Sequence, residues 1–303
     1  MEAYHLPVLL NECIEGLNIR PDGTYVDVTF GGGGHSRAIL ERLGPAGRLI
    51  AFDRDADAQR NALDDARFTL IHEDFRYLKN FLRLHGVRHV DGLLADLGVS
   101  SHQLDSAERG FSTRFDSELD LRMDCRAARS ARDVVNGDDE QTLRRILSLY
   151  GELPNASAMA RSICAARGRA PIDTTFQLKD AVAHLLPRGR ENKTLAMLFQ
   201  ALRIEVNGEL ESLSALLEQS SGVLKAGGRL AVISYHSLED RIVKNHLRSG
   251  RIDGIVQQDF YGNKLTPWRI VSRKAVTPSV AEVADNSRAR SAKLRIAERR
   301  DDG

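Results

Sequence analysis

The sequence predicts an α/β fold in which a doubly wound, mostly parallel sheet is interrupted by an inserted all-helical domain. Two observations predict it. Short β-branched and apolar runs alternate with helical patterns as far as Leu97, an order typical of parallel strands covered by helices. Helical periodicity then continues without a convincing strand, and the alternation returns near residue 208. We therefore expect one discontinuous domain over 1–102 and 208–303, and a helical domain over 103–207.

Each strand is expected from a short run rich in β-branched or apolar residues, such as TYVDVTF at 24–30. Right-handed crossovers between such strands give the doubly wound topology. The predicted strands are 24–30, 48–53, 68–72, 90–96 and 229–235, the last after a turn at 225–228, with late candidates at 268–272 and 293–297. The predicted helices are 36–43, 56–63, 75–85, 209–224 and 238–248, and, in the inserted domain, 140–150, 156–167, 175–186 and 193–202.

The composition is that of a globular protein of 303 residues, 42% hydrophobic and 28% charged. No apolar run reaches the roughly 18 residues that indicate a membrane span, and residues 1–17 lack the basic start of a signal peptide. The three cysteines are far apart and form no CxxC, which favours free thiols in a reducing cytoplasm. The nine histidines show no zinc-like spacing with cysteine, so we expect no structural metal. The sequence does not determine the oligomeric state, and a homodimer is one candidate.

Basic residues are concentrated in two segments although the net charge of the chain is only +1. Residues 161–203 hold eight Lys or Arg against three acids, a net charge of +5, and 269–300 hold nine against three, a net charge of +6. Such segments can form a polyanion-binding face. The alternative is an ordinary solvated helix and tail surface.

The run FGGGGHS, from Phe30 to Ser36, follows the first predicted strand. It is not a P-loop, because no Lys-Ser or Lys-Thr follows the glycines, and it fits the dinucleotide pattern G-x-G-x-x-G poorly, because Ser36 is the last residue. A third class has an acid that closes the first strand before G-x-G-x-G. This is the Rossmann-like methyltransferase class that uses S-adenosylmethionine (SAM). The segment from Asp27 to Gly33 resembles that motif, with Thr29 at the first glycine position.

Acids at three strand ends suit the parts of SAM. Asp27 can hold the ammonium group, directly or through water, while glycine N–H groups and the next helix N-terminus suit the carboxylate. Asp53 can accept both ribose hydroxyls, although NAD enzymes use the same device and a helix N-cap is the structural alternative. Phe75 can stack on adenine or pack in the core. Asp96 ends the fourth strand at the ligand-binding edge, or caps a helix.

Longer motifs extend the resemblance over nearly the whole chain. They are FGGGGHS, DRD (53–55), DLGVSSHQLD (96–105), ERGFS (108–112), LDLRMD (119–124), NGEL (207–210), ISYHSLEDRIVK (233–244) and NSRARSAKLRIAER (286–299). In these motifs and their order the chain resembles the RsmH (MraW) family of bacterial 16S rRNA cytosine-N4 methyltransferases.

The resemblance implies a class I methyltransferase domain that transfers one methyl group from SAM to the exocyclic N4 of a decoding-centre cytosine in 16S rRNA. The expected partner is 16S rRNA, in the 30S subunit. We expect the inserted helical domain to recognise RNA. The implied SAM contacts are Gly33, Gly34, His35, Asp53, Phe75, Asp96 and Gln103.

The candidate catalytic residues are Asp96, Tyr235 and His236. Asp96 or nearby carbonyls can accept a hydrogen bond from N4–H, in competition with a SAM contact. Tyr235 can stack on a flipped-out cytosine and His236 can hydrogen-bond it. Alternatively this segment is a strand-end cap, with Ser237 starting the next helix in a capping-box-like pattern. Family members often carry Phe where this chain has Tyr235.

Two arginines, Arg288 and Arg290, precede the last predicted strand and suit rRNA phosphates. The segment 249–268 is shorter than is usual in the family, and it is a further candidate for RNA contact.

Three other functions remain as alternatives to an rRNA methyltransferase. They are an NAD(P)-dependent oxidoreductase, a non-catalytic RNA-binding factor and a methyltransferase of another substrate.

Overall fold

The computed structural model describes residues 7–106 and 109–301. The chain divides into two compact units, an α/β unit of Met1–Gly98 with Leu210–Gly303 and a helical unit of Val99–Glu209. Two parts of the sequence discussed above lie outside the described residues, the first six residues and Glu108 of the ERGFS motif.

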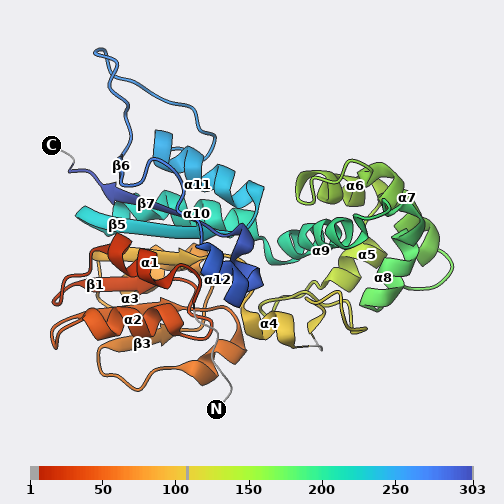
Figure 1. Cartoon of the computed structure of the whole chain (residues 1–303), viewed down its shortest axis with the longest axis horizontal. Helices are drawn as coiled ribbons and strands as arrows, with labels where there is room; N and C mark the ends of the chain where they lie inside the picture. Colours follow the sequence, from red (N-terminus) through yellow and green to blue (C-terminus); the bar gives the residue numbers. More distant parts are fainter. Residues whose placement is uncertain (1–6, 107–108, 302–303) are drawn as a thin grey trace. The chain divides into compact units, whose positions relative to one another are not determined.

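The α/β unit is built on a seven-stranded mixed sheet with the order β3-β2-β1-β4-β5-β7-β6 (Figure 1). The first five strands are parallel, and β7 pairs antiparallel with both β5 and β6. This confirms the predicted doubly wound, mostly parallel fold. The strands are β1 (Thr24–Asp27), β2 (Arg48–Phe52), β3 (Phe68–Ile71), β4 (Val90–Asp96), β5 (Leu224–Ser234), β6 (Trp268–Ile270) and β7 (Lys293–Arg299).

Helices cover both faces of this sheet because successive strand residues are apolar on alternate sides. In β4, Leu93 and Ala95 belong to one core, and Leu94 belongs to the core on the opposite face. The first core is covered by α3 (Leu78–Leu84), α10 (Glu209–Val223) and α11 (Ser237–Ser249), and the second by α1 (Leu10–Leu17) and α2 (Gly34–Arg42). The sheet is therefore buried on both faces, and ligands have access to its edges.

The helical unit has its own hydrophobic core, and the buried side-chain amide of Asn207 links two of its segments. Asn207 accepts a hydrogen bond from the Met123 N–H at 2.7 Å and donates to the Leu121 carbonyl at 2.7 Å. These bonds hold the LDLRMD segment on the end of α9. The helices are α4 (Ser101–Asp105), α5 (Ala131–Gly137), α6 (Glu140–Leu149), α7 (Ala156–Arg167), α8 (Thr175–Val182) and α9 (Glu191–Asn207).

Four elements differ from the sequence predictions. The helix predicted at 175–186 divides into α8 and a 3-10 helix, η4 (Ala183–Leu185). The helix predicted at 56–63 is a 3-10 helix, η1 (Ala56–Asn61), because this short segment buries only Ala58 and offers no apolar stripe. The helix predicted at 75–85 divides into η2 (Phe75–Tyr77) and α3. The turn predicted at 225–228 lies inside β5, where the register with β4 shifts and Gly227 has φ 76°. A glycine-containing bulge thus lengthens β5.

Four described α-helices lie outside the predicted helix ranges: α1, α4, α5 and α12 (Val280–Asp285). All are short, with five to eight residues, so each shows less than three turns of periodicity. Within the part of the chain that the structure describes, no helix is long and apolar enough to cross a lipid bilayer.

His246 on α11 provides a test of the core near β6. It is 2% exposed and meets Trp268 edge-on, with ring centroids 5.8 Å apart. Burial lowers the pKa of His246 to about 4. As the pH falls, the His246 imidazole is therefore protonated in the unfolded chain before it is protonated in the folded one. This preference lowers the free energy of unfolding between pH 6.5 and 4, by about 3 kcal/mol in total.

We expect His246→Leu to remove that part of the acid destabilisation. The measurement is urea unfolding at pH 7.5 and pH 4.5 for the wild type and the variant. Replacing the exposed His184 by Leu is the control and should leave the pH dependence unchanged. An equal loss of stability on acidification in the wild type and His246→Leu would contradict the assignment.

Candidate functional site

The predicted site residues of the α/β unit gather where the strand order reverses. β1 and β4 are neighbours, and the chain continues from β1 to β2 on one side and from β4 to β5 on the other, so the connections leave their carboxyl ends in opposite directions. Such a switch point opens a crevice at the carboxyl edge of the sheet, where α/β proteins bind ligands. The glycine run follows β1, Asp53 follows β2, and Asp96 ends β4. The chain order thus brings these residues to one edge.

The glycine run makes a tight turn that no larger residue would fit. Gly31 and Gly33 have φ of 51° and 76°, in the left-handed region, and Gly33 caps α2. A Cβ at Gly33 would lie 2.8 Å from the Phe30 ring, and one at Gly34 would collide with Pro7. The turn therefore exposes bare backbone at the first turn of α2, where helix N–H groups lack intrahelical partners. These donors suit a carboxylate.

Asp27 and Thr29 form the framework beneath that turn. Asp27 is 1% exposed, and its carboxylate accepts the Ser36 hydroxyl at 2.7 Å and the Thr29 N–H at 3.1 Å. The Thr29 hydroxyl accepts the Asp96 N–H at 2.7 Å. Threonine at the first glycine position of the motif therefore joins the ends of β1 and β4. Burial raises the pKa of Asp27.

Asp53 is directed toward the glycine turn. Its two oxygens accept the Gly31 N–H at 2.7 Å and the Asp55 N–H at 2.8 Å. Burial raises its pKa to about 6. The alternative role of a helix N-cap is wrong, because Asp55 caps η1 by accepting the Asp57 N–H. A carboxylate with two N–H donors retains lone pairs for further acceptor contacts.

Asp96, His35 and Tyr235 meet at the edge of the sheet. The Tyr235 hydroxyl donates to Asp96 at 2.8 Å, and His35 Nδ1 lies 3.8 Å from the other oxygen of this carboxylate. His35 Nε2 lies 3.1 Å from the Val8 carbonyl, which can only accept, so this nitrogen carries a proton. Burial raises the pKa of Asp96 to about 6, and that of the Tyr235 hydroxyl is raised too, by burial and then by Asp96.

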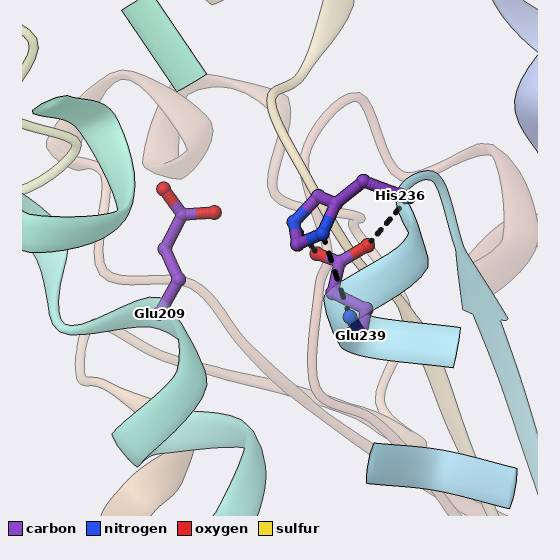
Figure 2. A group of neighbouring side chains, drawn as sticks. All are labelled: Glu209, His236 and Glu239. Atoms are coloured by element: carbon purple, nitrogen blue, oxygen red, sulfur yellow. Dashed lines mark hydrogen bonds and ion pairs between the residues drawn. The ribbon is translucent and has the colours of Figure 1, made fainter. Parts of the chain in front are cut away.

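Glu239 completes this group, and sequence reasoning missed it. It is 2% exposed and accepts the Tyr235 N–H at 2.8 Å and the His236 N–H at 3.3 Å. Figure 2 shows its carboxylate beside the His236 ring, with 3.2 Å between the His236 Nε2 and a Glu239 oxygen. Glu209, also drawn there, belongs to the helical unit and pairs with Arg203 at 2.8 Å.

The cap of α11 is therefore one residue earlier than the sequence suggested. His236 is the N-cap and Glu239 is the third helical residue, so the capping box is His-Ser-Leu-Glu. Ser237 is the first residue of the helix itself. The spacing of a glutamate three residues after the cap was the available signal, but histidine is an unusual cap.

Three carboxylates thus share one edge of the sheet: Asp27 and Glu239 are buried, and the Asp96 side chain is 23% exposed. Asp27 and Glu239 both raise the pKa of Asp96, and His35 acts in the opposite direction. Burying like charges together is costly unless a cation or a proton neutralises them. A ligand that carries positive charge would relieve this repulsion. The observation is independent of any sequence motif.

The other predicted residues occupy separate places. Phe75, on η2, packs against the first core of the α/β unit. Gln103 belongs to the helical unit, is 5% exposed, and makes a capping box with Ser100 at the start of α4. Arg288 and Arg290 are on η5 (Ser287–Ser291), with Arg290 exposed and Arg288 partly buried.

The segment between α11 and β6 forms a hairpin-like arm with exposed aromatic side chains at its tip. Phe260 is 96% exposed and Tyr261 is 85% exposed. The backbone of the turn that carries them is held by Asp259, which accepts the Tyr261 N–H at 2.9 Å and the Asn263 N–H at 2.8 Å. Gly262, with φ 84°, completes the turn. The arm is the long loop in the upper part of Figure 1.

The partial burial of Asp96, together with its repulsion by Asp27 and Glu239, predicts a stabilised variant. Because the pKa of Asp96 is raised from 3.8 to about 6, its ionised form destabilises the fold above pH 6 and has no effect below pH 3.8. We expect Asp96→Asn to raise the free energy of unfolding at pH 8 by about 2–3 kcal/mol relative to its effect at pH 4.

Urea unfolding at the two pH values measures this difference, with Asp22→Asn, an exposed carboxylate of the same unit, as the control. A difference no larger than that of Asp22→Asn would show that the Asp96 carboxylate is not strained by its surroundings.

Comparison with known proteins identifies relatives of the whole chain. A relative from Flavobacterium johnsoniae, ribosomal RNA small subunit methyltransferase H, is 57% identical over 296 residues, 98% of each chain. The protein of that name from Bacteroides thetaiotaomicron is 54% identical over 298 residues, again 98% of each chain. Among solved structures, an rRNA methylase from Streptococcus thermophilus matches at 11% identity and a TM-score of 0.42, over 99% of each chain. The model of the MraW methylase family matches residues 2–300. The chain belongs to the MraW methylase family.

Proposed function

We propose that this chain transfers one methyl group from SAM to the exocyclic N4 of a cytosine in the decoding centre of 16S rRNA. The family and the relatives named for small-subunit rRNA methylation support the substrate class. The structural observation that supports SAM as the methyl donor is the group of three carboxylates at the switch point, Asp27, Asp96 and Glu239. SAM carries an ammonium and a sulfonium cation, which would offset their negative charge. The chain is a SAM-dependent methyltransferase.

The residues at this edge fit SAM. The first turn of α2, at Gly33, Gly34 and His35, offers N–H donors to its carboxylate. Asp53 offers acceptor lone pairs to the ribose hydroxyls, and Phe75 lies after β3 on the side proposed for adenine. Asp96 faces the cationic part, and Gln103 is the proposed contact from the helical unit.

SAM supplies a methyl group on a sulfonium sulfur, the electrophile of an in-line displacement. The protein has to align cytosine N4 with that methyl group. The N4 lone pair is conjugated into the ring, so a hydrogen bond from N4–H to Asp96 would make the nitrogen more nucleophilic. Tyr235 and His35 fix the carboxylate for this task. When N4 loses its proton, Asp96, with a pKa near 6, is the acceptor at hand.

Tyr235 and His236 are proposed to hold the cytosine. The Tyr235 hydroxyl is occupied by Asp96, which leaves the ring face to stack on a flipped-out base. Glu239 fixes the backbone of both residues, so their positions relative to the Asp96 carboxylate are set before substrate arrives. Preorganisation of this kind lowers the cost of alignment.

Basic side chains of both units are proposed to hold the rRNA backbone. In the helical unit, Arg188, Arg190 and Lys193 are exposed where α9 begins. In the α/β unit, Arg290 is exposed on η5 beside Arg288. The exposed Phe260 and Tyr261 suit stacking on unpaired bases.

We propose that the substrate is the 30S subunit and that the protein acts in the cytoplasm. A homodimer is the oligomeric state to be tested.

The proposal is tested with tritiated SAM and 30S subunits that lack the modification. We expect label in N4-methylcytidine after nucleoside digestion, and no label in other nucleosides. Asp96→Asn should lower the rate about 100-fold or more, as expected for a lost proton acceptor. Size-exclusion chromatography with light scattering on the same preparation measures the oligomeric state.

Three outcomes separate the alternatives. Label in another nucleoside would indicate a different methylation target. RNA binding without label would indicate a non-catalytic factor. Reduction of a nicotinamide cofactor without label would indicate an oxidoreductase. Naked 16S rRNA, assayed beside the subunit, distinguishes free RNA from the assembled particle as the substrate.

The η5 arginines should act on RNA and not on SAM. We expect Arg288→Ala with Arg290→Ala to weaken 16S rRNA binding and to lower the salt slope by about 1 to 2, because each phosphate contact contributes about 0.7–0.9 to it. SAM affinity, measured by calorimetry, should be unchanged. Arg20→Ala with Arg42→Ala, two exposed arginines of the same unit, is the control. An unchanged slope in the η5 variant would indicate a structural role.

A further inference from the structure

An open cavity lies in the α/β unit, away from the edge that carries Asp96. Its volume is about 710 Å³. Its basic lining comes from two places. Lys79 and Arg83 are four residues apart on α3, so they lie on one face of that helix. Arg88 and His89 immediately precede β4, which begins at Val90.

The cavity is at the amino end of β4, and the methyl-transfer site is at the carboxyl end. β4 has seven residues, which corresponds to a separation of about 20 Å along the strand. The cavity is therefore not part of the crevice at the switch point. No residue proposed above to contact SAM or cytosine lines it.

The cavity is basic and its cations are unpaired. No acidic residue is among the described residues that line it. Lys79, Arg83 and Arg88 are exposed, and none of their side chains takes part in an ion pair or hydrogen bond within the described ranges 7–106 and 109–301. Many other arginines of this chain pair with a nearby aspartate, as Arg67 does with Asp65. Three unpaired like charges around one cavity repel each other unless an anion lies among them.

The shape of the cavity also suits a phosphate backbone. Its floor is apolar and firm, because Leu82, Val87 and Val223 are buried core residues. Gly86 and Gly222 line it, and a Cβ built on either would meet nothing within 4 Å. Main chain is thus accessible between the basic side chains, as in sites where an anion approaches bare backbone.

We propose that this cavity binds phosphate groups of the rRNA backbone, as a second anchoring site remote from the methylated base. The proposal rests on the proposed function for its choice of RNA. Three cations exceed what one phosphate monoester needs, and they suit consecutive phosphates of a strand. A strand that reached both edges of the sheet would span on the order of six nucleotides at about 3.4 Å each.

The test compares two triple variants of the full chain. Lys79→Gln, Arg83→Gln and Arg88→Gln remove the cavity charges, and Arg20→Gln, Arg42→Gln and Arg60→Gln remove the same charge from exposed positions elsewhere in the unit. Binding of a 16S rRNA transcript is measured between 50 and about 300 mM salt. We expect the cavity variant to lose about tenfold or more in affinity and about 2 in salt slope, and the control to lose clearly less.

The same slope and affinity in the cavity variant as in the wild type, or equal losses in both variants, would overturn the proposal. A parallel measurement of inorganic tripolyphosphate binding, alone and in competition with the transcript, distinguishes RNA from a small phosphate ligand. Wild-type binding of tripolyphosphate that the cavity variant loses, with RNA binding unchanged, would reject RNA and assign the site to a small phosphate ligand. Thermal unfolding verifies that both variants fold.

The methylation assay separates this proposal from the proposed function. At saturating 30S subunits, the cavity variant should keep the wild-type kcat, with a higher KM. A wild-type protein that binds the transcript through the cavity but transfers no methyl group would overturn the proposed function alone.

Discussion

The contact between the Tyr235 hydroxyl and the Asp96 carboxylate is the interaction on which the candidate site depends. It joins the ends of β4 and β5, and the Thr29 hydroxyl joins the end of β1 to the same residue by accepting the Asp96 backbone N–H. The ends of three neighbouring strands are thus fixed by short hydrogen bonds. Buried hydrogen bonds to a carboxylate are strong, and removing one partner leaves the other unsatisfied. The crevice therefore keeps its form only if the carboxylate stays in place.

The same arrangement explains why acidic residues occupy a region that the fold would otherwise keep apolar. The sheet is buried on both faces, and its strands are correspondingly hydrophobic. Asp27, Asp96 and Glu239 interrupt this pattern only at the carboxyl edge. Each accepts hydrogen bonds from N–H or O–H donors, which offset part of the cost of their burial and of their mutual repulsion. A positively charged ligand would offset the electrostatic free energy of placing these carboxylates close together.

The sequence predicted the order of the strands and the ends of the strands at which the glycine turn, Asp53 and Asp96 lie. Strand order along the chain was readable because period-two and helical patterns are local. The glycine turn and Asp53 were readable because their motif lies within 27 residues of sequence, from Asp27 to Asp53. The Tyr235–Asp96 bond joins residues 139 positions apart, and no local pattern specifies it. Glu239 was missed because histidine rarely caps a helix, and η1 was mistaken for an α-helix because propensity does not separate short helical types.

Glu239 has a consequence for how this protein can change over evolutionary time. Its carboxylate both starts α11 and fixes the backbone of Tyr235 and His236. A single side chain is thus subject to selection for folding and for geometry at once. A lineage cannot repair a weakened helix start here without shifting the two residues proposed to hold the base. Substrate preference at this edge is therefore expected to drift slowly, and new specificities are more accessible through the solvent-facing arm at 255–265, which carries no comparable double constraint.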